Sequence, residues 1–577
     1  MKTKVLTILF CVLFLYPLAA KADFNWSSVG ACDPVFLRVT YADADASTSM
    51  GVAWNTKEEC QTVVEYGESL AYGQTATGKT FKANGALNWV HEVLIENLKP
   101  NTTYHYRVGD GSKFSDDKTF VTAPPPSALC PEFVFAFAGD SRADTDGVGP
   151  SEKWDDIVTE ALNDSRAAFV LNGGDLVKNG GSDKEWLNYL VGTPDLMALY
   201  PVMPVLGNHD DGPGQGDGAN YNQVFNLPRN PKTGTEDYYY FRYGNTLIVG
   251  LDTVNYTDFK AQSEWVDEIM AEHSDVTWKI AIFHHPVYTS AGIDVFGLEV
   301  GHPPNEVGQN ETYVKMFDKH SFDLAIGSHN HYYERFSPSF GGYGKEANPV
   351  SSPEEGTIYM VSGGGGAITF QDMGVKAICG YLAAKGSEAC SGKHHYIKFE
   401  IKGYSLKMET WETTQQTISS DPKNRKKIDE LVINKPFQGV DPCTLPPADD
   451  DDDVSDAGAG MDISMGEDVE EEDAADSGDD DDEDVSDGGD MELPDEEDGG
   501  YTDVSDEETG NDDDAPVIED AGEKDQNSPP KEEDNGSDDV SDSKDSSDQD
   551  DGTPSAEENK GSVSSEEASG CSCRARN

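Results

Sequence analysis

At Asp449 the composition of this chain changes abruptly, and the change confines any packed fold to the first 448 residues. From Asp449 to Asn577 there are 52 acidic and 6 basic residues and almost no aromatic ones. Such a segment cannot bury enough apolar surface to offset the entropy of ordering it. Residues 449–577 are therefore predicted to be a disordered, acidic, low-complexity tail, and its dense carboxylates are expected to gather Ca²⁺ weakly.

The formal net charge of −67 is shared unequally between the two parts of the chain. The tail carries −46 of it, which leaves −21 on the first 448 residues. An acidic surface of this kind repels nucleic acids and anionic lipids. We therefore expect no nucleic-acid partner.

The N-terminus has the pattern of a secretory signal peptide. Lys2 and Lys4 precede an apolar stretch over residues 5–20, and Ala20-Lys21-Ala22 supplies the small residues of a cleavage site. The stretch is shorter than the roughly 20 residues that a membrane span needs. Residues 1–22 are therefore predicted to be a signal peptide, and the mature protein is expected to be secreted or extracytoplasmic, without a membrane span.

Eight cysteines remain once the predicted signal peptide is removed. An even number in an exported protein predicts disulfides. Cys379 and Cys390 flank a short loop and are the expected pair, whereas the partners of the others stay open. These others are Cys32, Cys60, Cys130, Cys443, Cys571 and Cys573.

Residues 32–122 are predicted to form an all-β domain. Short runs such as residues 49–54 and 62–66 are rich in β-formers and are divided by Gly, Asn and Asp. The run from Leu98 to Val108 resembles the L-x-P-x-T-x-Y-x-Y-x-V signature of fibronectin type III domains. That resemblance implies a seven-stranded sandwich.

Residues 131–412 alternate between strand and helix patterns. Phe133 to Ala138 is a buried-strand run that ends at Gly139-Asp140. The next segment places apolar residues on one face of a helix, at Trp154, Ile157, Val158, Ala161 and Leu162. Polar residues at strand ends of an α/β domain lie where ligands usually bind. The strand ends of this region are therefore the expected functional site.

Five short motifs at predicted strand ends carry the chemistry. Together they offer two carboxylates, an amide oxygen and three imidazoles, a mixture that suits Zn, Mn or Fe. Cleavage of phosphate esters uses two such cations about 3.5–4 Å apart, which clamp the phosphoryl oxygens and activate a water. The motifs are Gly139-Asp140, Gly174-Asp175, Gly207-Asn208-His209-Asp210, His284-His285-Pro286 and His329-Asn330-His331.

The motif order GD…GD…GNHD…HxP…HxH resembles that of the calcineurin-like metallophosphoesterases. The fibronectin-like region in front of it, and Tyr333-Glu334-Arg335 after the last motif, resemble the purple acid phosphatases. This resemblance implies an α/β/β/α sandwich that holds two divalent or trivalent metal ions (Fe, Zn or Mn). It also implies a secreted acid-phosphatase-like enzyme that hydrolyses small phosphate esters by attack of a metal-bound hydroxide.

The resemblance also implies a role for each site residue. Metal 1 is expected to be bound by two of them and metal 2 by three, with one carboxylate bridging the metals. His209 is expected to contact the phosphate and to protonate the leaving group, with Asp210 behind it. The implied ligands are Asp140 and His331 for metal 1, Asn208, His284 and His329 for metal 2, and Asp175 for the bridge.

The chain departs from the family pattern around metal 1. Most of the superfamily has D-x-H at the first motif, and this chain has Asp140-Ser141-Arg142. Lys178 stands where purple acid phosphatases have a Tyr, so metal 1 lacks an obvious third protein ligand. The D-[ST]-R pattern is similar to that of a bacterial group in the superfamily. Arg142 is a candidate to hold phosphate through its bidentate fork, and a plain salt bridge is the open alternative.

A second function remains open, that of a non-catalytic cation-binding or surface protein on a degenerate phosphoesterase scaffold. The incomplete set of ligands for metal 1 and the long acidic tail favour it. Cys571-Ser572-Cys573 resembles the start of bacterial sorting tails, which makes surface attachment through the C-terminus a further expectation. The retention of six candidate ligands favours the enzyme.

Overall fold

The computed structural model describes residues 24–437 and Cys443, with short gaps. The predicted signal peptide and the predicted acidic tail both lie outside these residues. No helix in the described part of the chain is long and apolar enough to cross a membrane. The gaps are residues 129, 145–149, 152, 155, 156, 158, 160, 163–166, 212–219, 256, 296, 297, 343, 374–378, 380–382 and 414–425.

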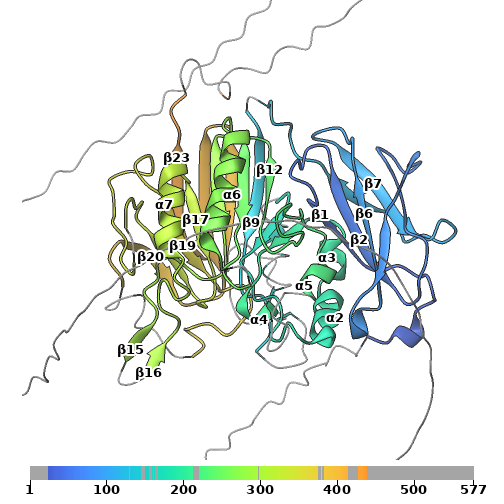
Figure 1. The fold of residues 1–577 in the computed structure, drawn as a ribbon, viewed down its shortest axis with the longest axis horizontal. Coiled ribbons are helices and arrows are strands. Elements are labelled where there is room, and N and C mark those ends of the chain that lie inside the picture. Colours follow the sequence, from blue (N-terminus) through green and yellow to red (C-terminus); the bar gives the residue numbers. More distant parts are fainter. Residues whose placement is uncertain are drawn as a thin grey trace, which may run out of the picture. The chain divides into compact units, whose positions relative to one another are not determined.

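The first domain consists of two antiparallel four-stranded sheets (Figure 1). It therefore has eight strands, one more than the predicted sandwich. One sheet has the order β1 (Val35–Thr40), β2 (Met50–Thr56), β6 (Trp89–Ile95) and β5 (Lys79–Lys82). The other has the order β4 (Gln74–Thr77), β3 (Val63–Gly67), β7 (Thr103–Gly109) and β8 (Lys118–Val121). Two short 3₁₀ helices are η1 (Trp26–Ser28) and η2 (Gly85–Leu87).

The signature from Leu98 to Val108 forms a corner of this domain. Tyr104 is buried at the start of β7, and its hydroxyl accepts a hydrogen bond from the backbone N–H of Lys99 at 2.9 Å. A hydroxyl that bonds to the backbone a few residues upstream is the tyrosine corner of β-sandwiches. The signature therefore fixes the turn into β7.

The second domain contains two sheets packed face to face. The six-stranded sheet has the order β11 (Val202–Pro204), β10 (Val170–Asn172), β9 (Glu132–Phe137), β21 (His395–Lys402), β22 (Ser405–Glu412) and β23 (Lys426–Asn434). The seven-stranded sheet has the order β12 (Tyr239–Tyr243), β13 (Thr246–Gly250), β14 (Trp278–Ile282), β17 (Leu324–Gly327), β19 (Ile358–Ser362), β18 (Tyr333–Phe336) and β20 (Ser387–Ser391). A separate hairpin pairs β15 (Ile293–Val295) with β16 (Leu298–Val300).

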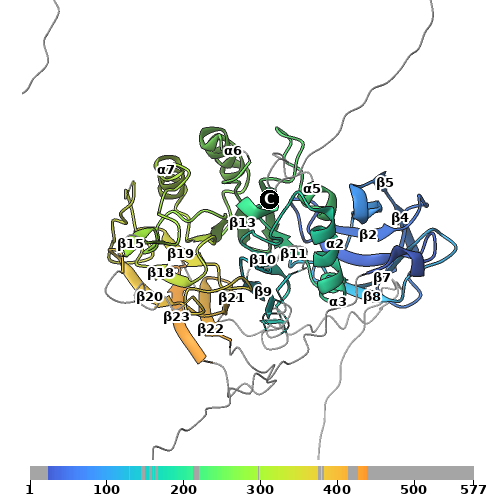
Figure 2. The ribbon, with the colours of Figure 1, turned by 90° about the horizontal axis from the view of Figure 1, so that it is seen from below.

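Helices cover the outer face of the seven-stranded sheet and lie beside the six-stranded one (Figure 2). Asp258 caps the N-terminus of α6 by accepting a hydrogen bond from Ala261 N, and Trp265 and Ile269 face the core. On the outer face lie α6 (Phe259–Glu272) and α7 (Asn310–His320). The shorter helices are α2 (Asp183–Gly192), α3 (Pro194–Met197), α4 (Asn208–Asp211) and α5 (Tyr221–Val224).

Apolar side chains connect the two sheets, since Phe133 of β9 and Tyr243 of β12 lie 4.6 Å apart between ring centroids. Phe135 on β9 stacks on Phe169 at 5.1 Å and on Phe399 of β21 at 4.8 Å between ring centroids. β9, β10 and β11 run parallel in one sheet, and β13, β14, β17 and β19 run parallel in the other. The sequences of strands that are buried on both faces are continuous apolar runs. The predicted order, an all-β domain followed by an α/β domain, is confirmed.

One boundary is wrong, because β23 continues the six-stranded sheet beyond residue 412, the predicted end of the domain. A polar stretch separates β22 from β23 in the sequence, and the charged start of β23 hides its strand pattern. β23 is nevertheless paired with β22 along its length, from Lys426 to Asn434.

Three disulfides connect the described cysteines. The predicted pair Cys379–Cys390 is confirmed. The sequence left the other partners open, and they are Cys32–Cys60 and Cys130–Cys443. The second of these ties the linker in front of β9 to the chain after β23, across 313 residues of sequence. It closes a very long loop of the unfolded chain, which is the case in which a cross-link removes the most chain entropy.

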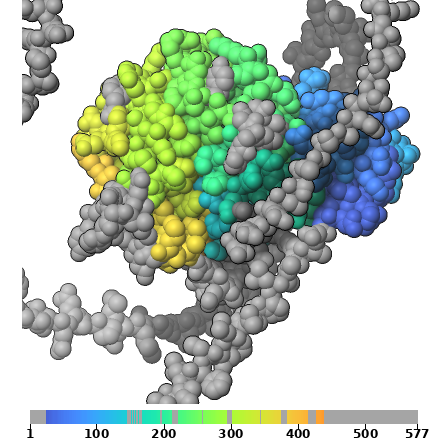
Figure 3. Space-filling model, turned by 60° about the horizontal axis from the view of Figure 1, so that its bottom comes forward, coloured from blue at the N-terminus to red at the C-terminus, as the bar shows by residue number. Residues whose placement is uncertain are grey.

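The two domains are in direct contact (Figure 3). The hydroxyl of Tyr106 on β7 donates to the carbonyl of Ala198 at 2.7 Å. Arg38 on β1 is buried and donates through Nε to the carbonyl of Val224 at 2.5 Å. Buried polar groups of one domain are thus satisfied by backbone carbonyls of the other.

Candidate metal centre

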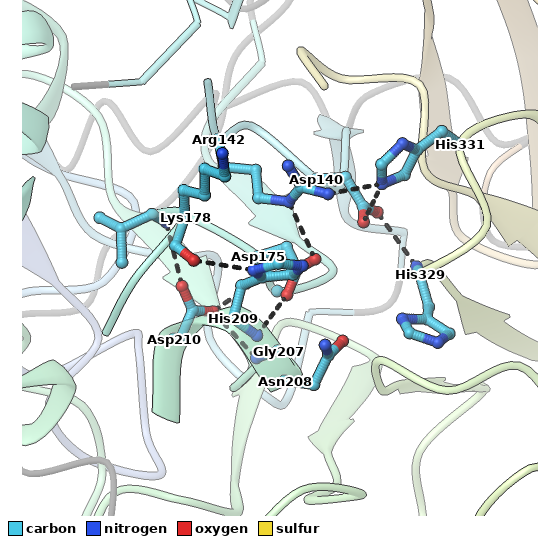
Figure 4. Close-up of polar contacts among 12 residues, drawn as sticks. Asp140, Arg142, Asp175, Lys178, Gly207, Asn208, His209, Asp210, His329 and His331 are labelled. Atoms are coloured by element: carbon cyan, nitrogen blue, oxygen red, sulfur yellow. Dashed lines mark hydrogen bonds and ion pairs between the residues drawn. The ribbon is translucent and has the colours of Figure 1, made fainter. Parts of the chain in front are cut away.

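The predicted ligands converge from the strand ends of both sheets (Figure 4). Asp140 and Asp175 follow β9 and β10, and Asn208 begins α4 after β11. His284 follows β14 and His329 follows β17. Because the carboxyl ends of parallel strands share one edge of a sheet, the two packed sheets bring all five residues to one place.

The converging side chains form two groups that share Asp175. Group 1 contains Asp140, Asp175 and His331, and group 2 contains Asp175, His284 and His329. Within each group the three ligand atoms lie within 4.8 Å of one another. Asp175 Oδ1 lies 3.4 Å from His284 Nε2, in group 2, so Oδ2 is the oxygen left for group 1. Asn208 Oδ1 lies 2.9 Å from His284 Nε2 and extends group 2.

The backbone is strained where it presents these ligands. Asp140 and Asp175 each have a φ of 57°, and His329 has a φ of 66°. Residues other than glycine rarely adopt this left-handed backbone conformation. Such backbone strain is concentrated at functional sites. Close packing adds a second constraint, since a Cβ on Gly207 would lie 2.1 Å from the backbone nitrogen of Asp175. Gly207 therefore has to be glycine.

The histidines are oriented by their outer nitrogens. His284 Nδ1 lies 2.8 Å from the carbonyl of Gly173, and His331 Nδ1 lies 2.8 Å from the carbonyl of Ile368. His329 Nε2 lies 3.0 Å from Glu306 Oε2. Each of these contacts places the ring proton on the outer nitrogen. The inner nitrogen of each ring is left with a lone pair directed into its group, as in histidines that bind metals.

Two features of the apoprotein fit bound cations. His284 Nε2 and His329 Nδ1 lie 3.1 Å apart, and both carry lone pairs once their outer nitrogens donate. Asp140 Oδ1 is buried without a hydrogen bond, 3.4 Å from His331 Nε2. Facing lone pairs and an unsatisfied buried carboxylate oxygen are unfavourable unless a cation lies between them. The residues of both groups therefore fit metal ions.

The protonation states of Asp175 and His329 agree with this donor set, whereas burial lowers the pKa of His331 but the adjacent Asp140 outweighs burial and raises it. Burial raises the pKa of Asp175, but His284, His209 and Arg142 outweigh burial and hold that pKa below its usual range. Burial lowers the pKa of His329 to about 4. At neutral pH Asp175 is therefore ionised and His329 is neutral, which are the forms that bind metal ions.

Asp210 does not lie behind His209, so this part of the prediction is wrong. Asp210 Oδ1 accepts backbone hydrogen bonds from Leu176 and Val177, at 2.7 and 3.1 Å. Its Oδ2 accepts from the backbone N–H groups of Asp175 and Gly207, at 2.8 and 2.9 Å. The short distance in sequence made a contact with the neighbouring ring plausible, but the first turn of α4 points the carboxylate into the loop. Asp210 is a positioning residue for Asp175.

The ring of His209 is held by another partner. Its Nδ1 lies 2.7 Å from the backbone carbonyl of Lys178, and the residue is half-buried. The carbonyl fixes the proton on Nδ1 and leaves Nε2 to face the centre.

Arg142 forms a salt bridge with Asp175 at the metal centre. Its Nε lies 3.3 Å from Asp175 Oδ2, and its Nη1 lies 3.2 Å from Asp144 Oδ1. Lys178 donates through Nζ to the backbone carbonyl of Asp144 at 2.7 Å. Lys178, which stands where the purple acid phosphatase pattern has a Tyr, therefore places a second cation close to Arg142.

Sequence reasoning missed His302 and Glu306. Glu306 Oε1 lies 3.3 Å from His302 Nδ1, and the ring of His302 lies 3.8 Å from the ring of His329, between centroids. Both residues follow the β15–β16 hairpin rather than a strand of either main sheet, so no strand-end pattern marks them. Glu306, His285 and His329 also form a third group of potential ligand atoms. Because Glu306 already accepts from His329, we interpret it as an outer partner of group 2.

Fold and site together define a calcineurin-like metallophosphoesterase. Residues 133–333 match the family model of the calcineurin-like phosphoesterases. Residues 34–122 match the model of the purple acid phosphatase N-terminal domain. The chain is thus a purple acid phosphatase-like member of that class.

Individual relatives agree with this assignment at low identity. The chain is 25% identical over 310 residues to "Probable inactive purple acid phosphatase 1" of Arabidopsis thaliana, across 48% of this chain and about half (49%) of that protein. It is 26% identical over 400 residues to "Purple acid phosphatase 22" of the same plant, across 63% of this chain and 82% of that one. A purple acid phosphatase from yellow lupin (Lupinus luteus) seeds shares the fold, with a TM-score of 0.57 and 20% identity, across 70% of this chain and 74% of that one.

Proposed function

We propose that this chain is an exported phosphatase that hydrolyses small phosphate esters with two metal ions. The observation that carries the proposal is the pair of three-residue groups joined by Asp175. A carboxylate whose two oxygens face different groups is suited to bridge two cations. Fe, Zn and Mn are the metals whose ligand preferences match imidazole together with carboxylate.

Asp140 and His331 are proposed to bind metal 1, and Asn208, His284 and His329 to bind metal 2. When bound, the two cations polarise the phosphoryl oxygens and lower the pKa of a water molecule. Glu306 and two backbone carbonyls hold the outer nitrogens of the histidines and thereby direct the inner nitrogens at the two groups. The protein thereby fixes the geometry of the donor atoms before any metal arrives.

Three side chains are proposed to act on the ester itself. In its doubly protonated form His209 donates from Nε2 to a phosphoryl oxygen or to the leaving oxygen, while its Nδ1 donates to the carbonyl of Lys178. Arg142 offers a planar fork of N–H donors to the phosphoryl oxygens. His302 is half-exposed beside His329, and Glu306 holds its Nδ1, so it is a second donor of a proton to the leaving group.

The test is hydrolysis of a chromogenic phosphate monoester by the purified, mature chain. Chelation should abolish turnover, and Zn, Mn or Fe should restore it. A diester substrate measured in parallel reports the preference between the two ester classes. Stoichiometric metal binding without turnover of either ester would contradict the proposal.

One observation favours a non-catalytic cation-binding protein as the second candidate. Arg142 contacts Asp175 in group 1 and lies 3.5 Å from His331 Nε2, so one metal position is partly covered. One relative, 25% identical over 310 residues, bears the name "Probable inactive purple acid phosphatase 1". Metal binding with no turnover, in wild type and after loading with each metal, is the result that selects this candidate.

A further inference from the structure

The two halves of the metal centre differ in the charges that surround them. Group 2 is bordered by the carbonyl of Gly173 and the carboxylate of Glu306, which both attract cations. Within the described residues, no Lys or Arg side chain forms a hydrogen bond or ion pair with Asn208, His284 or His329. Group 1 is bordered by the guanidinium of Arg142 instead.

Arg142 covers two of the three ligand atoms of group 1 (Figure 4). Its Nε lies 3.3 Å from Asp175 Oδ2, which is the oxygen turned away from His284. Its Nη2 lies 3.5 Å from His331 Nε2, the ring nitrogen on the other side from the Nδ1 that contacts the carbonyl of Ile368. The guanidinium thus faces the atoms that a metal at group 1 needs.

Other residues hold the guanidinium in this place. Asp144 Oδ1 accepts from Arg142 Nη1 at 3.2 Å, and Asp144 Oδ2 accepts from the backbone N–H of Ile368 at 2.9 Å. Ile368 in turn supplies the carbonyl that orients His331. The side chain of Arg142 is only 10% exposed. Arg142 is therefore part of a connected network and not a mobile surface side chain.

We propose that Arg142 acts as a built-in cation that weakens metal binding at group 1, so that group 2 fills first and group 1 fills only when the guanidinium leaves Asp175. The inference rests on the proposed metal centre. Like charges a few ångströms apart repel strongly where water is excluded, so metal and guanidinium compete for Asp175 Oδ2. A phosphoryl group is a strong acceptor for the released guanidinium fork. Phosphate therefore draws Arg142 away and tightens metal binding at group 1, and the coupling is reciprocal.

The test is calorimetric titration of the metal-free, full-length protein with Mn²⁺ in phosphate-free buffer, with stoichiometry from native mass spectrometry. Wild type should show two steps whose affinities differ by at least tenfold. Arg142→Gln should tighten the weak step by at least tenfold and leave the tight step unchanged. Arg107→Gln is the matched control, because it removes the same charge from an ion pair with Glu65 in the first domain and should change neither step.

A second variant and a second ligand make the test specific. Arg142→His removes the fixed charge and adds a nitrogen ligand, so it should tighten the weak step at least as much as Arg142→Gln. Inorganic phosphate should tighten the weak step in wild type by at least tenfold and should have no such effect in Arg142→Gln. Circular dichroism establishes that each variant is folded.

The outcomes separate this inference from the proposed function. Two steps of equal affinity in wild type would overturn the inference and leave the metal centre intact. So would an Arg142→Gln variant whose weak step is unchanged or weaker. The absence of any metal binding, in wild type and in both variants, would overturn the proposed metal centre and the inference together.

Discussion

Two clusters of buried charged side chains occur in different parts of this chain, and they are built in opposite ways. At the metal centre, Asp140 keeps a buried oxygen without a hydrogen bond. At the contact between the domains, Glu92 on β6 faces Arg229 and Glu236 of the second domain. Arg229 Nη2 lies 2.7 Å from Glu236 Oε1 and 3.9 Å from Glu92 Oε2. Glu92 and Glu236 also keep buried oxygens without a hydrogen bond, but Lys79 and Arg229 lie against them as ion-pair partners, whereas Asp140 faces the imidazole of His331.

The difference lies in how each cluster compensates its negative charge. Burial raises the pKa of Glu236, and the nearby Glu92 raises it further. Arg229, 2.7 Å from Glu236 Oε1, opposes this shift without cancelling it, so Glu236 holds a proton more strongly than a free glutamate does. At the metal centre His284, His209 and Arg142 hold the pKa of Asp175 low instead, so that it keeps its charge. The pKa shifts of the buried carboxylates therefore run in opposite directions in the two clusters.

The largest expected effect is that of Asp175→Asn. Even the outer partners of metal ligands change affinity or activity by about 10- to 100-fold. Loss of a carboxylate that faces both groups should therefore reduce monoester turnover by more than about 100-fold and lower the affinity of both metal positions. The measurements are steady-state kinetics and metal content. Asp116→Asn, at an exposed position of the first domain, is the control, and wild-type turnover in Asp175→Asn would refute the bridging role.

Glu306→Gln should have an intermediate effect, because it removes the anionic partner of His329 and keeps the shape of the side chain. We expect the affinity of the tight metal position to fall by about 10- to 100-fold. Titration with Mn²⁺ measures it. Glu311→Gln is the matched control, since Glu311 lies on the exposed face of α7 and pairs with Lys315. Equal affinities in the two variants would show that Glu306 does not support group 2.

Glu236→Gln tests the other cluster through the pH dependence of stability. Because the pKa of Glu236 is raised on folding, the unfolded chain loses this proton first as pH rises above about 4.5. Wild type should therefore lose stability from that pH up to the folded pKa, by up to about 1.4 kcal/mol for each pH unit. The variant lacks this slope and should melt at a higher temperature than wild type at pH 8, with little difference at pH 5. Melting curves of wild type, Glu236→Gln and the exposed control Glu264→Gln over this range measure the effect. Parallel slopes in all three would mean that Glu236 is ionised at the interface.

The smallest effect is expected from removal of the acidic tail. Both clusters belong to the described part of the chain, so truncation after Pro447 should change neither the melting temperature nor monoester turnover at physiological salt. At low salt the dense negative charge acts over roughly 10–30 Å, and truncation should then raise turnover of an anionic ester slightly. A large loss of stability or turnover at physiological salt would show that the tail packs on the enzyme.

The two clusters also differ in how well the sequence predicts their residues. The ligands of the metal centre are short polar motifs at the ends of apolar strands, so their types and order can be recognised locally. The interface residues Glu92, Arg229 and Glu236 carry no such pattern. They lie far apart in the sequence and meet only because two domains pack together. His302 and Glu306 were missed for a similar reason, since a hairpin brings them to His329.

The sequence by itself determined the two-domain order, the pairing of Cys379 with Cys390, and the residue types that gather at the strand ends. These depend on local periodicity and on the spacing of neighbouring residues. Only the tertiary structure decided that Asp210 binds the loop around Asp175, that Lys178 orients His209, and that Arg142 covers group 1. Each of these depends on the direction of a side chain relative to a distant backbone. That direction is set when two sheets pack face to face, and no local pattern of residues encodes it.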